Sequence, residues 1–151
     1  FEYEGKAFVT AYDTEPFRNL FPTDPADPSY DEEACREGEA AAREENEKLL
    51  RFFQGADLLV HDSQYTAKEY TQGGKIGFGH TSYEYAINAA HKAGVKNLLL
   101  FHHDPNRSDA ELQELELFYQ SKVGGKSSLN LEMAREGRTY TLGSPLPGRG
   151  A

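Results

Sequence analysis

Runs of apolar residues of strand length alternate along this chain with longer segments of helical character. The apolar runs cover residues 6–12, 57–61 and 95–101, and each run is followed by polar or turn-forming residues. Capping-box spacing at Ser29–Glu32, Thr81–Glu84 and Ser108–Glu111 opens three predicted helices, which stop at Gly55, at Gly94 and near Gly124-Gly125. The alternation of strands and helices predicts an α/β fold with parallel pairing and short connections.

The same pattern predicts finer features. The buried end of the first helix should carry Leu49, Leu50, Phe52 and Phe53, and one face of the third should carry Leu112, Leu115, Phe118 and Tyr119. Residues 129–142 are predicted to form a hairpin that turns at Glu136-Gly137. Residues 17–30 are predicted to form a loop rich in proline and aspartate. Residues 1–6 read as the middle of a β-hairpin, so we expect an upstream part of the protein.

Polar side chains follow each of the three apolar runs. They are Asp13 after the first, His61-Asp62 at the end of the second and His102-His103-Asp104 after the third, and His80 stands just before a predicted helix. The carboxyl ends of parallel strands lie along one edge of a sheet, where ligands bind. Because polar groups at buried strand ends need partners, a metal ion or a tight polar network would satisfy them together.

Each motif also has a plainer interpretation. Asp13-Thr14-Glu15-Pro16 taken alone favours an ordinary turn, and His61 favours a satisfied core histidine. One histidine of the pair His102-His103 could lie on the surface, and Gly77-Phe78-Gly79 could be only a flexible loop. A Ser63, His80 and aspartate triad is disfavoured, because the chain has no Gly-x-Ser-x-Gly nucleophile elbow. The prediction of a site therefore depends on the motifs occurring together.

Composition narrows the class of protein. With 25 acidic and 16 basic residues among 151, the net charge of −9 disfavours a non-specific nucleic-acid binder. A single cysteine, Cys35, excludes an internal disulfide and fits a reducing compartment. No apolar run approaches the length of a membrane span, so we expect a cytoplasmic protein with no membrane partner.

Four motifs in order resemble the C-terminal half of the metallo-β-lactamase-fold hydrolases, in the branch that contains ribonuclease Z and phosphodiesterases. They are Asp13-Thr14-Glu15-Pro16, His61-Asp62-Ser63-Gln64-Tyr65-Thr66, Gly79-His80-Thr81-Ser82 and Leu100-Phe101-His102-His103-Asp104-Pro105. The resemblance covers nearly the whole chain and implies one half of an αββα sandwich. Asp62 stands where the family motif has Glu, and Thr81-Ser82 reverses its Ser-Thr order, which favours the general hydrolase branch over a tRNA-processing enzyme.

The resemblance implies a role for each matching residue. Asp13 matches the aspartate that bridges two metal ions, and His102 matches the last metal-binding histidine. His80 matches a histidine near the scissile phosphate that donates a proton or stabilises charge, and Asp62 matches the acidic residue that orients it. The implied cofactor is a divalent metal, two zinc ions in the first place, with manganese or iron as alternatives.

The family's His-x-His-x-Asp-His signature does not occur in the chain, nor does a further metal-binding histidine before Asp13. We therefore expect residues 1–151 to form a single domain that is one half of the fold and inactive by itself. Its partner would be an N-terminal half or a second copy, packed on an exposed apolar face of the sheet. The predicted function is a metal-dependent phosphodiesterase-type hydrolase of a small-molecule or nucleotide phosphodiester; the alternative is a non-catalytic interaction or ligand-binding module.

Overall fold

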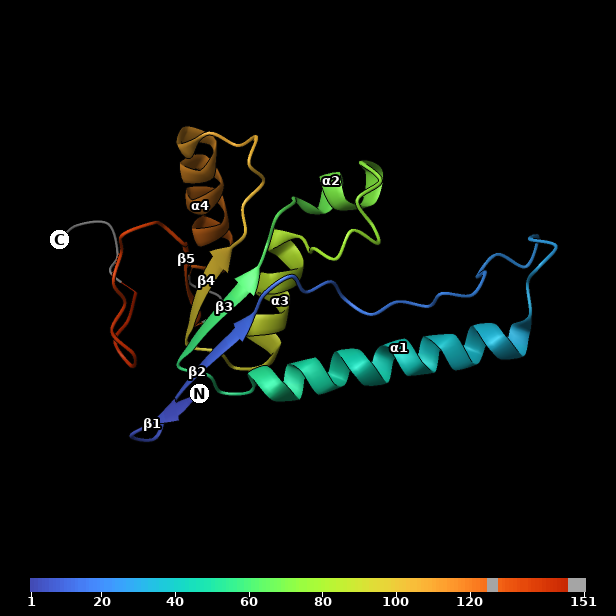
Figure 1. Ribbon diagram of the computed structural model, residues 1–151, viewed down its shortest axis with the longest axis horizontal. Coiled ribbons are helices and arrows are strands. Elements are labelled where there is room, and N and C mark those ends of the chain that lie inside the picture. Colours follow the sequence, from blue (N-terminus) through green and yellow to red (C-terminus); the bar gives the residue numbers. More distant parts are fainter. Residues whose placement is uncertain (125–127, 147–151) are drawn as a thin grey trace. The chain divides into compact units, whose positions relative to one another are not determined.

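A computed structural model describes residues 1–124 and 128–146 of the chain (Figure 1). They divide into two compact units, one of Phe1–Glu15 with Phe53–Ala151 and one of Pro16–Phe52. The predicted α/β class is confirmed, because the first unit contains a mixed sheet of five strands with helices. No helix within the described ranges is both long and apolar enough to cross a membrane.

The strands follow one another across the sheet in chain order, β1-β2-β3-β4-β5. They are β1 (Glu2–Tyr3), β2 (Lys6–Ala11), β3 (Leu58–Asp62), β4 (Asn97–Phe101) and β5 (Asn130–Met133). β1 and β2 form an antiparallel hairpin whose turn residues, Glu4 and Gly5, have φ of 49° and 72°, and β2 to β5 are all parallel. As predicted, the carboxyl ends of β2, β3 and β4 therefore point the same way (Figure 1).

Helices α3 (Tyr83–Lys92) and α4 (Asp109–Val123) connect successive parallel strands. Since such crossovers are right-handed, both helices lie on the same face of the sheet, and α3 lies behind it in Figure 1. Leu59, Leu98 and Leu100 point to this face and are fully buried. This layer is the core that fixes the strand ends relative to one another.

The opposite face of the sheet carries Leu58, Val60 and Leu99, all of them buried. Residues of the C-terminal segment pack against this cluster, namely Ala134, Tyr140, Leu142 and Leu146. The expectation of an exposed apolar face is therefore wrong for this part of the sheet. Tyr12 and Phe101, beside the carboxyl ends of β2 and β4, remain 54% and 40% exposed, and their rings lie 5.2 Å apart.

β5 has α4 along its outer side, and side chains of α4 bond to its backbone. The Glu116 carboxylate accepts a hydrogen bond from the Met133 backbone N–H, and the Gln120 amide donates one to the Leu131 carbonyl. Free backbone groups on an edge strand need such partners when the edge is covered. Glu116 is consequently buried and Phe118 is 50% exposed, so the predicted apolar face of this helix is wrong at Phe118.

The predicted capping boxes have three different outcomes. The box at Ser108–Glu111 is confirmed at the start of α4. The N-cap of α3 is Ser82 rather than Thr81, because Ser82 accepts the hydrogen bond from the Tyr85 N–H. The box at Ser29–Glu32 is absent, since the Ser29 hydroxyl donates to Asp27 and the Asp31 carboxylate accepts from the Ala34 N–H instead.

A short helix was not predicted. α2 (Ala67–Gln72) has its own capping box, formed by Thr66 and Glu69.

The segment after β5 also differs from the prediction. The chain turns at Glu136-Gly137, but no second strand follows β5 within the described residues, so the hairpin prediction is wrong.

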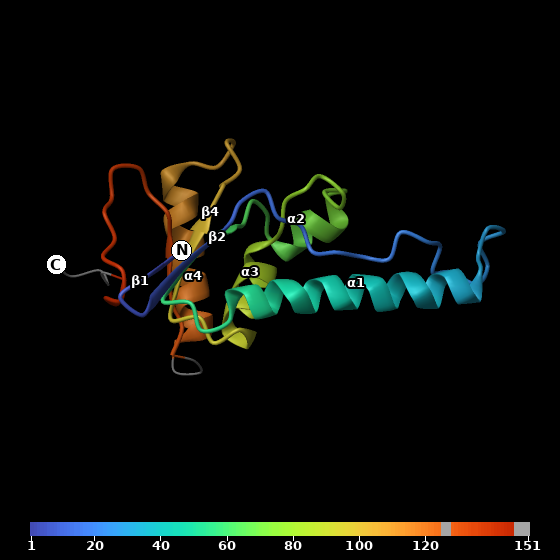
Figure 2. The same ribbon diagram turned by 60° about the horizontal axis from the view of Figure 1, so that its bottom comes forward.

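The second compact unit contains most of α1 (Glu32–Phe53) and the proline-rich loop before it (Figure 2). The Asn46 side chain holds the loop by accepting from the Phe17 N–H and donating to the Phe17 carbonyl. Cys35 is buried and reduced, and the Asn19 amide donates to its carbonyl. At the end of α1 Phe53 is buried, whereas Phe52 is 64% exposed, which corrects the predicted buried end.

Candidate metal centre

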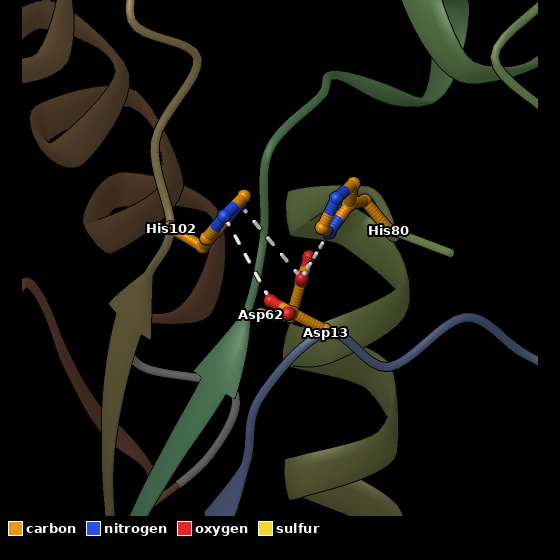
Figure 3. A group of neighbouring side chains, drawn as sticks. All are labelled: Asp13, Asp62, His80 and His102. Carbon is orange, nitrogen blue, oxygen red and sulfur yellow. Dashed lines mark hydrogen bonds and ion pairs between the residues drawn. The ribbon is translucent and has the colours of Figure 1, made fainter. Parts of the chain in front are cut away.

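Four polar side chains meet at the carboxyl edge of the sheet (Figure 3). Asp13 follows β2, Asp62 is the last residue of β3, His102 follows β4, and His80 comes from the loop that leads into α3. Each offers one donor atom, and these four atoms all lie within 4.8 Å of one another. The predicted strand-end residues are thus brought together by the parallel pairing of β2, β3 and β4.

Asp62 lies at the centre of the cluster and is completely buried. One of its carboxylate oxygens is 2.6 Å from His80 Nδ1, and the other accepts the Thr81 backbone N–H at 3.1 Å. An ionised carboxylate only accepts, so His80 Nδ1 carries the proton of this bond. His80 Nε2 is then the ring atom left to exchange protons with another molecule.

His102 lies between the two carboxylates. Its Nε2 is 3.7 Å from Asp13 Oδ1 and its Nδ1 is 4.0 Å from Asp62 Oδ2. Its ring stacks on that of His80, with centroids 4.3 Å apart and 15° between the planes. His102 Nδ1 is buried and has no hydrogen-bond partner among the described residues.

Two residues of the cluster have an uncommon backbone conformation. Asp13 and His102 have φ of 47° and 61°, and apart from Glu4 in the β1–β2 turn they are the only non-glycine residues of the described ranges with positive φ. This region is sparsely populated by L-residues, though aspartate and histidine enter it more readily than most. Residues in this backbone region cluster at functional sites in proteins, and here two of them stand at strand ends that share one cluster.

The donor set matches the chemistry of a divalent cation. Two carboxylates and two imidazoles are the ligands chosen by zinc, manganese and iron. Asp13 and Asp62 are close enough to repel each other when both are ionised, and a cation would remove that repulsion. A bound ion would also give one ring nitrogen of His102, either the buried Nδ1 or Nε2, a partner. The residues present therefore fit a metal.

Comparison with known proteins gives partial matches to curated ribonuclease Z sequences. The chain is 41% identical over 63 residues to ribonuclease Z of Ignicoccus hospitalis and 40% identical over 70 residues to that of Exiguobacterium sibiricum. It is 35% identical over 63 residues to that of Thermoplasma volcanium. Part of this chain is similar to ribonuclease Z. The relationship implies a metallo-β-lactamase fold, in agreement with the predicted fold class.

The ribonuclease Z relationship is limited in extent. The matches cover 42% to 46% of this chain and only 20% to 22% of the length of the relatives. No protein-family model and no solved structure matches the chain at comparable significance.

Other residues that were predicted or discounted from the sequence lie close to the donor cluster. Ser63 is buried and donates to the Phe101 carbonyl at 3.0 Å, as a structural contact. His103 is half-buried with both ring nitrogens enclosed, and His102 is half-buried as well. Burial lowers the pKa of the His103 imidazole from its ordinary value.

Two contributors to the site were not predicted from sequence. Glu15 accepts hydrogen bonds from the loop that precedes His80, although its motif reads as a simple turn. Arg107 forms an ion pair with Glu69 and lies over the Tyr83 ring at 5.8 Å, which joins the loop after β4 to α2 and α3. No local sequence signal identifies either contact, because each joins segments far apart in the chain.

His61 belongs to the core, as favoured from the sequence. It is completely buried, and its Nδ1 donates to the Asp62 carbonyl at 2.7 Å. Its Nε2 has no hydrogen-bond partner in the described part of the chain. Burial lowers the pKa of His61 from its ordinary value of 6.5, because a charged ring would lose its hydration without gaining an acceptor at Nε2.

Protonation of His61 is expected to destabilise the fold at mildly acidic pH. Below the ordinary histidine pKa the unfolded chain binds a proton that the folded chain does not, so the free energy of unfolding falls as the pH falls through about 6.5. Urea unfolding in a metal chelator at about pH 7.5 and about pH 5.5 measures this loss. His61→Leu cannot titrate at this position and should lose less stability over the same interval; equal losses would contradict the prediction.

Proposed function

We propose that this chain supplies part of the active site of a metal-dependent hydrolase that cleaves phosphodiesters. The observation that carries the proposal is the convergence of donor atoms from Asp13, Asp62, His80 and His102 within 4.8 Å at one sheet edge. The homologous ribonucleases Z, by their name, act on RNA, which is a phosphodiester. This relationship supports a phosphodiester rather than another hydrolysable bond.

Asp13 and His102 are the proposed metal ligands. The side chain of Asp13 is 71% exposed and that of His102 is 35% exposed, and their facing atoms are 3.7 Å apart. Asp62 is fully buried with both oxygens already engaged, so it is the less available ligand. When bound, the divalent ion, for which zinc is our first choice, supplies positive charge to the phosphate and lowers the pKa of a water molecule.

His80 is the proposed proton donor to the leaving oxygen. Asp62 holds its Nδ1–H, which fixes the ring orientation and leaves Nε2 to give or take the proton. Asp62 itself is held by the Thr81 N–H within a buried setting, so the pair is oriented before the substrate binds. His80 is 20% exposed at its side chain, which gives a substrate access to the ring.

The remaining metal ligands are proposed to come from a second segment of protein. A zinc ion takes three or four protein ligands, and a pair of ions takes more than Asp13 and His102 can offer. The source would be an N-terminal half of the fold or a second copy of this chain. Robust hydrolysis by the 151-residue chain alone would overturn this part of the proposal.

Replacing Asp13 with asparagine should test the metal-dependent function. Asparagine tolerates the positive φ of this position but offers an uncharged, weaker ligand, so the fold should be kept. Loss of an outer-shell partner costs about 10- to 100-fold in metal affinity, and loss of a direct ligand should cost at least as much. Isothermal titration with Zn²⁺ or Mn²⁺ measures the affinity, and bis(4-nitrophenyl) phosphate reports hydrolysis by the chain alone and with an added N-terminal half.

The matched control for this experiment is Asp24→Asn. Asp24 lies in the other compact unit, and its carboxylate accepts from the local Ala26 N–H, a bond that asparagine can also accept. It should leave metal affinity and hydrolysis unchanged. If Asp13→Asn also leaves both unchanged, Asp13 is not a ligand and the proposed function fails.

A further inference from the structure

Glu15 bonds to the glycine-rich loop that precedes His80. One carboxylate oxygen accepts from the Gly77 backbone N–H at 2.6 Å and from the Tyr70 hydroxyl at 2.6 Å. The other oxygen accepts from the Gly79 N–H at 2.9 Å, directly before His80. Both oxygens are therefore occupied by protein donors, and Glu15 is not part of the donor cluster.

The glycine-rich loop has few other means of keeping one conformation. Gly77 and Gly79 have φ of 89° and 83°, and neither has a side chain that could pack. The neighbouring apolar residues Ile76 and Phe78 are 42% and 60% exposed. The backbone bonds from the Lys75 and Phe78 N–H groups are both 3.3 Å long, whereas those to Glu15 are shorter. Within the described part of the chain, Glu15 thus accepts the shortest hydrogen bonds that residues 75–79 make.

On its other side, His80 is already fixed to the sheet. Asp62 accepts from the His80 ring and from the Thr81 N–H, and the Thr81 carbonyl accepts from the backbone after β3. These bonds do not fix the backbone conformation of the residues that lead into His80. That conformation depends on Gly79, whose N–H donates a hydrogen bond to Glu15.

Glu15 also belongs to the same short segment as Asp13, after the end of β2. A rigid contact between Glu15 and the loop therefore connects the segment of the proposed metal ligand to the segment of the proposed proton donor. We propose that Glu15 is a positioning residue that holds His80 at a fixed place relative to Asp13. This inference rests on the proposed function, since it assigns Glu15 a part in the same reaction.

Glu15→Gln is the informative variant. The glutamine carbonyl oxygen can still accept from Gly77 and Tyr70. Its NH2 group would then point at the Gly79 N–H, and because both are donors they cannot bond to each other. The Gly79 bond is then lost while size and shape are retained. Tyr70→Phe is the comparison, because it removes the hydroxyl bond to Glu15 and leaves both loop amides accepted. Glu114→Gln, at an exposed position of α4, is the control for loss of charge.

Two measurements test the inference. Amide hydrogen exchange in the metal-free chain should be faster at Gly79 in Glu15→Gln, and unchanged there in Tyr70→Phe and Glu114→Gln. In the form that hydrolyses bis(4-nitrophenyl) phosphate, kcat of Glu15→Gln should fall about 10- to 100-fold, as for loss of supporting contacts around a site. Zn²⁺ affinity should stay unchanged, because Glu15 is not a ligand.

Unchanged amide exchange at Gly79 in Glu15→Gln would overturn the inference. So would a parallel fall in Zn²⁺ affinity, which would make Glu15 a support of the metal ligands rather than of His80. Amide exchange does not need an active enzyme. If no form hydrolyses the phosphodiester, the proposed function fails and the part assigned to Glu15 in the reaction falls with it, but the contact itself is still tested by exchange.

Discussion

Replacing His80 with glutamine is expected to lower kcat for phosphodiester hydrolysis by about 10²- to 10⁴-fold, the usual contribution of a positioned acid or base. Glutamine can still donate to Asp62 and accept a bond from the solvent side, but it cannot transfer a proton at the position of His80 Nε2. Because the proposed ligands are Asp13 and His102, Zn²⁺ affinity should fall much less than kcat. Steady-state kinetics with bis(4-nitrophenyl) phosphate and a Zn²⁺ titration of the same variant measure the two quantities.

The matched control is His91→Gln. His91 is an exposed residue in α3, on the helix that follows His80, and lies outside the donor cluster. Its replacement should leave kcat and Zn²⁺ affinity as they are. Should His80→Gln retain the full rate, His80 would have no part in proton transfer. If the rate survives in both His80→Gln and Asp13→Asn, the hydrolysis does not depend on the donor cluster and the proposed active site fails.

The position of the site could be predicted from sequence because it depends on local order in the chain. Asp13, Asp62 and His102 each end or follow an apolar run, and parallel neighbours bring such ends together whatever the rest of the fold does. His80 is different, since it follows no strand. Its place before a predicted helix singles it out, its role comes from the resemblance of its motif, and it reaches the cluster because its Nδ1–H bonds to Asp62.

The details that escaped prediction depend on contacts between distant segments. Thr81 and Glu84 have capping-box spacing, yet the Glu84 carboxylate instead accepts from the Ala67 N–H and the Tyr119 hydroxyl. The helix therefore begins one residue later, with Ser82 as its cap. Local spacing predicts that a helix starts here, whereas hydrogen bonds to distant segments decide which residue caps it.

Glu15 shows the same limit at the site itself. The Gly79 N–H that it accepts is 64 residues away, so no spacing rule could relate the two. The exposure of Phe118 also has a non-local cause: α4 turns Glu116 toward the covered edge of β5, where the Met133 N–H needs an acceptor. Giving the buried Met133 N–H a hydrogen-bond acceptor thus outweighs the burial of one aromatic ring.

The same sheet that brings the site together should be sensitive to loss of volume in its centre. Leu98 lies in β4 between β3 and β5 and is fully buried on the face covered by helices. Leu98→Ala is expected to lower the free energy of unfolding by about 2–5 kcal/mol, through lost burial and an incompletely filled cavity. Leu117→Ala, in α4 and 47% exposed, should change it by less than about 0.5 kcal/mol. Urea denaturation followed by far-ultraviolet circular dichroism compares the two variants, and equal effects would mean that β4 is not at the centre of the core.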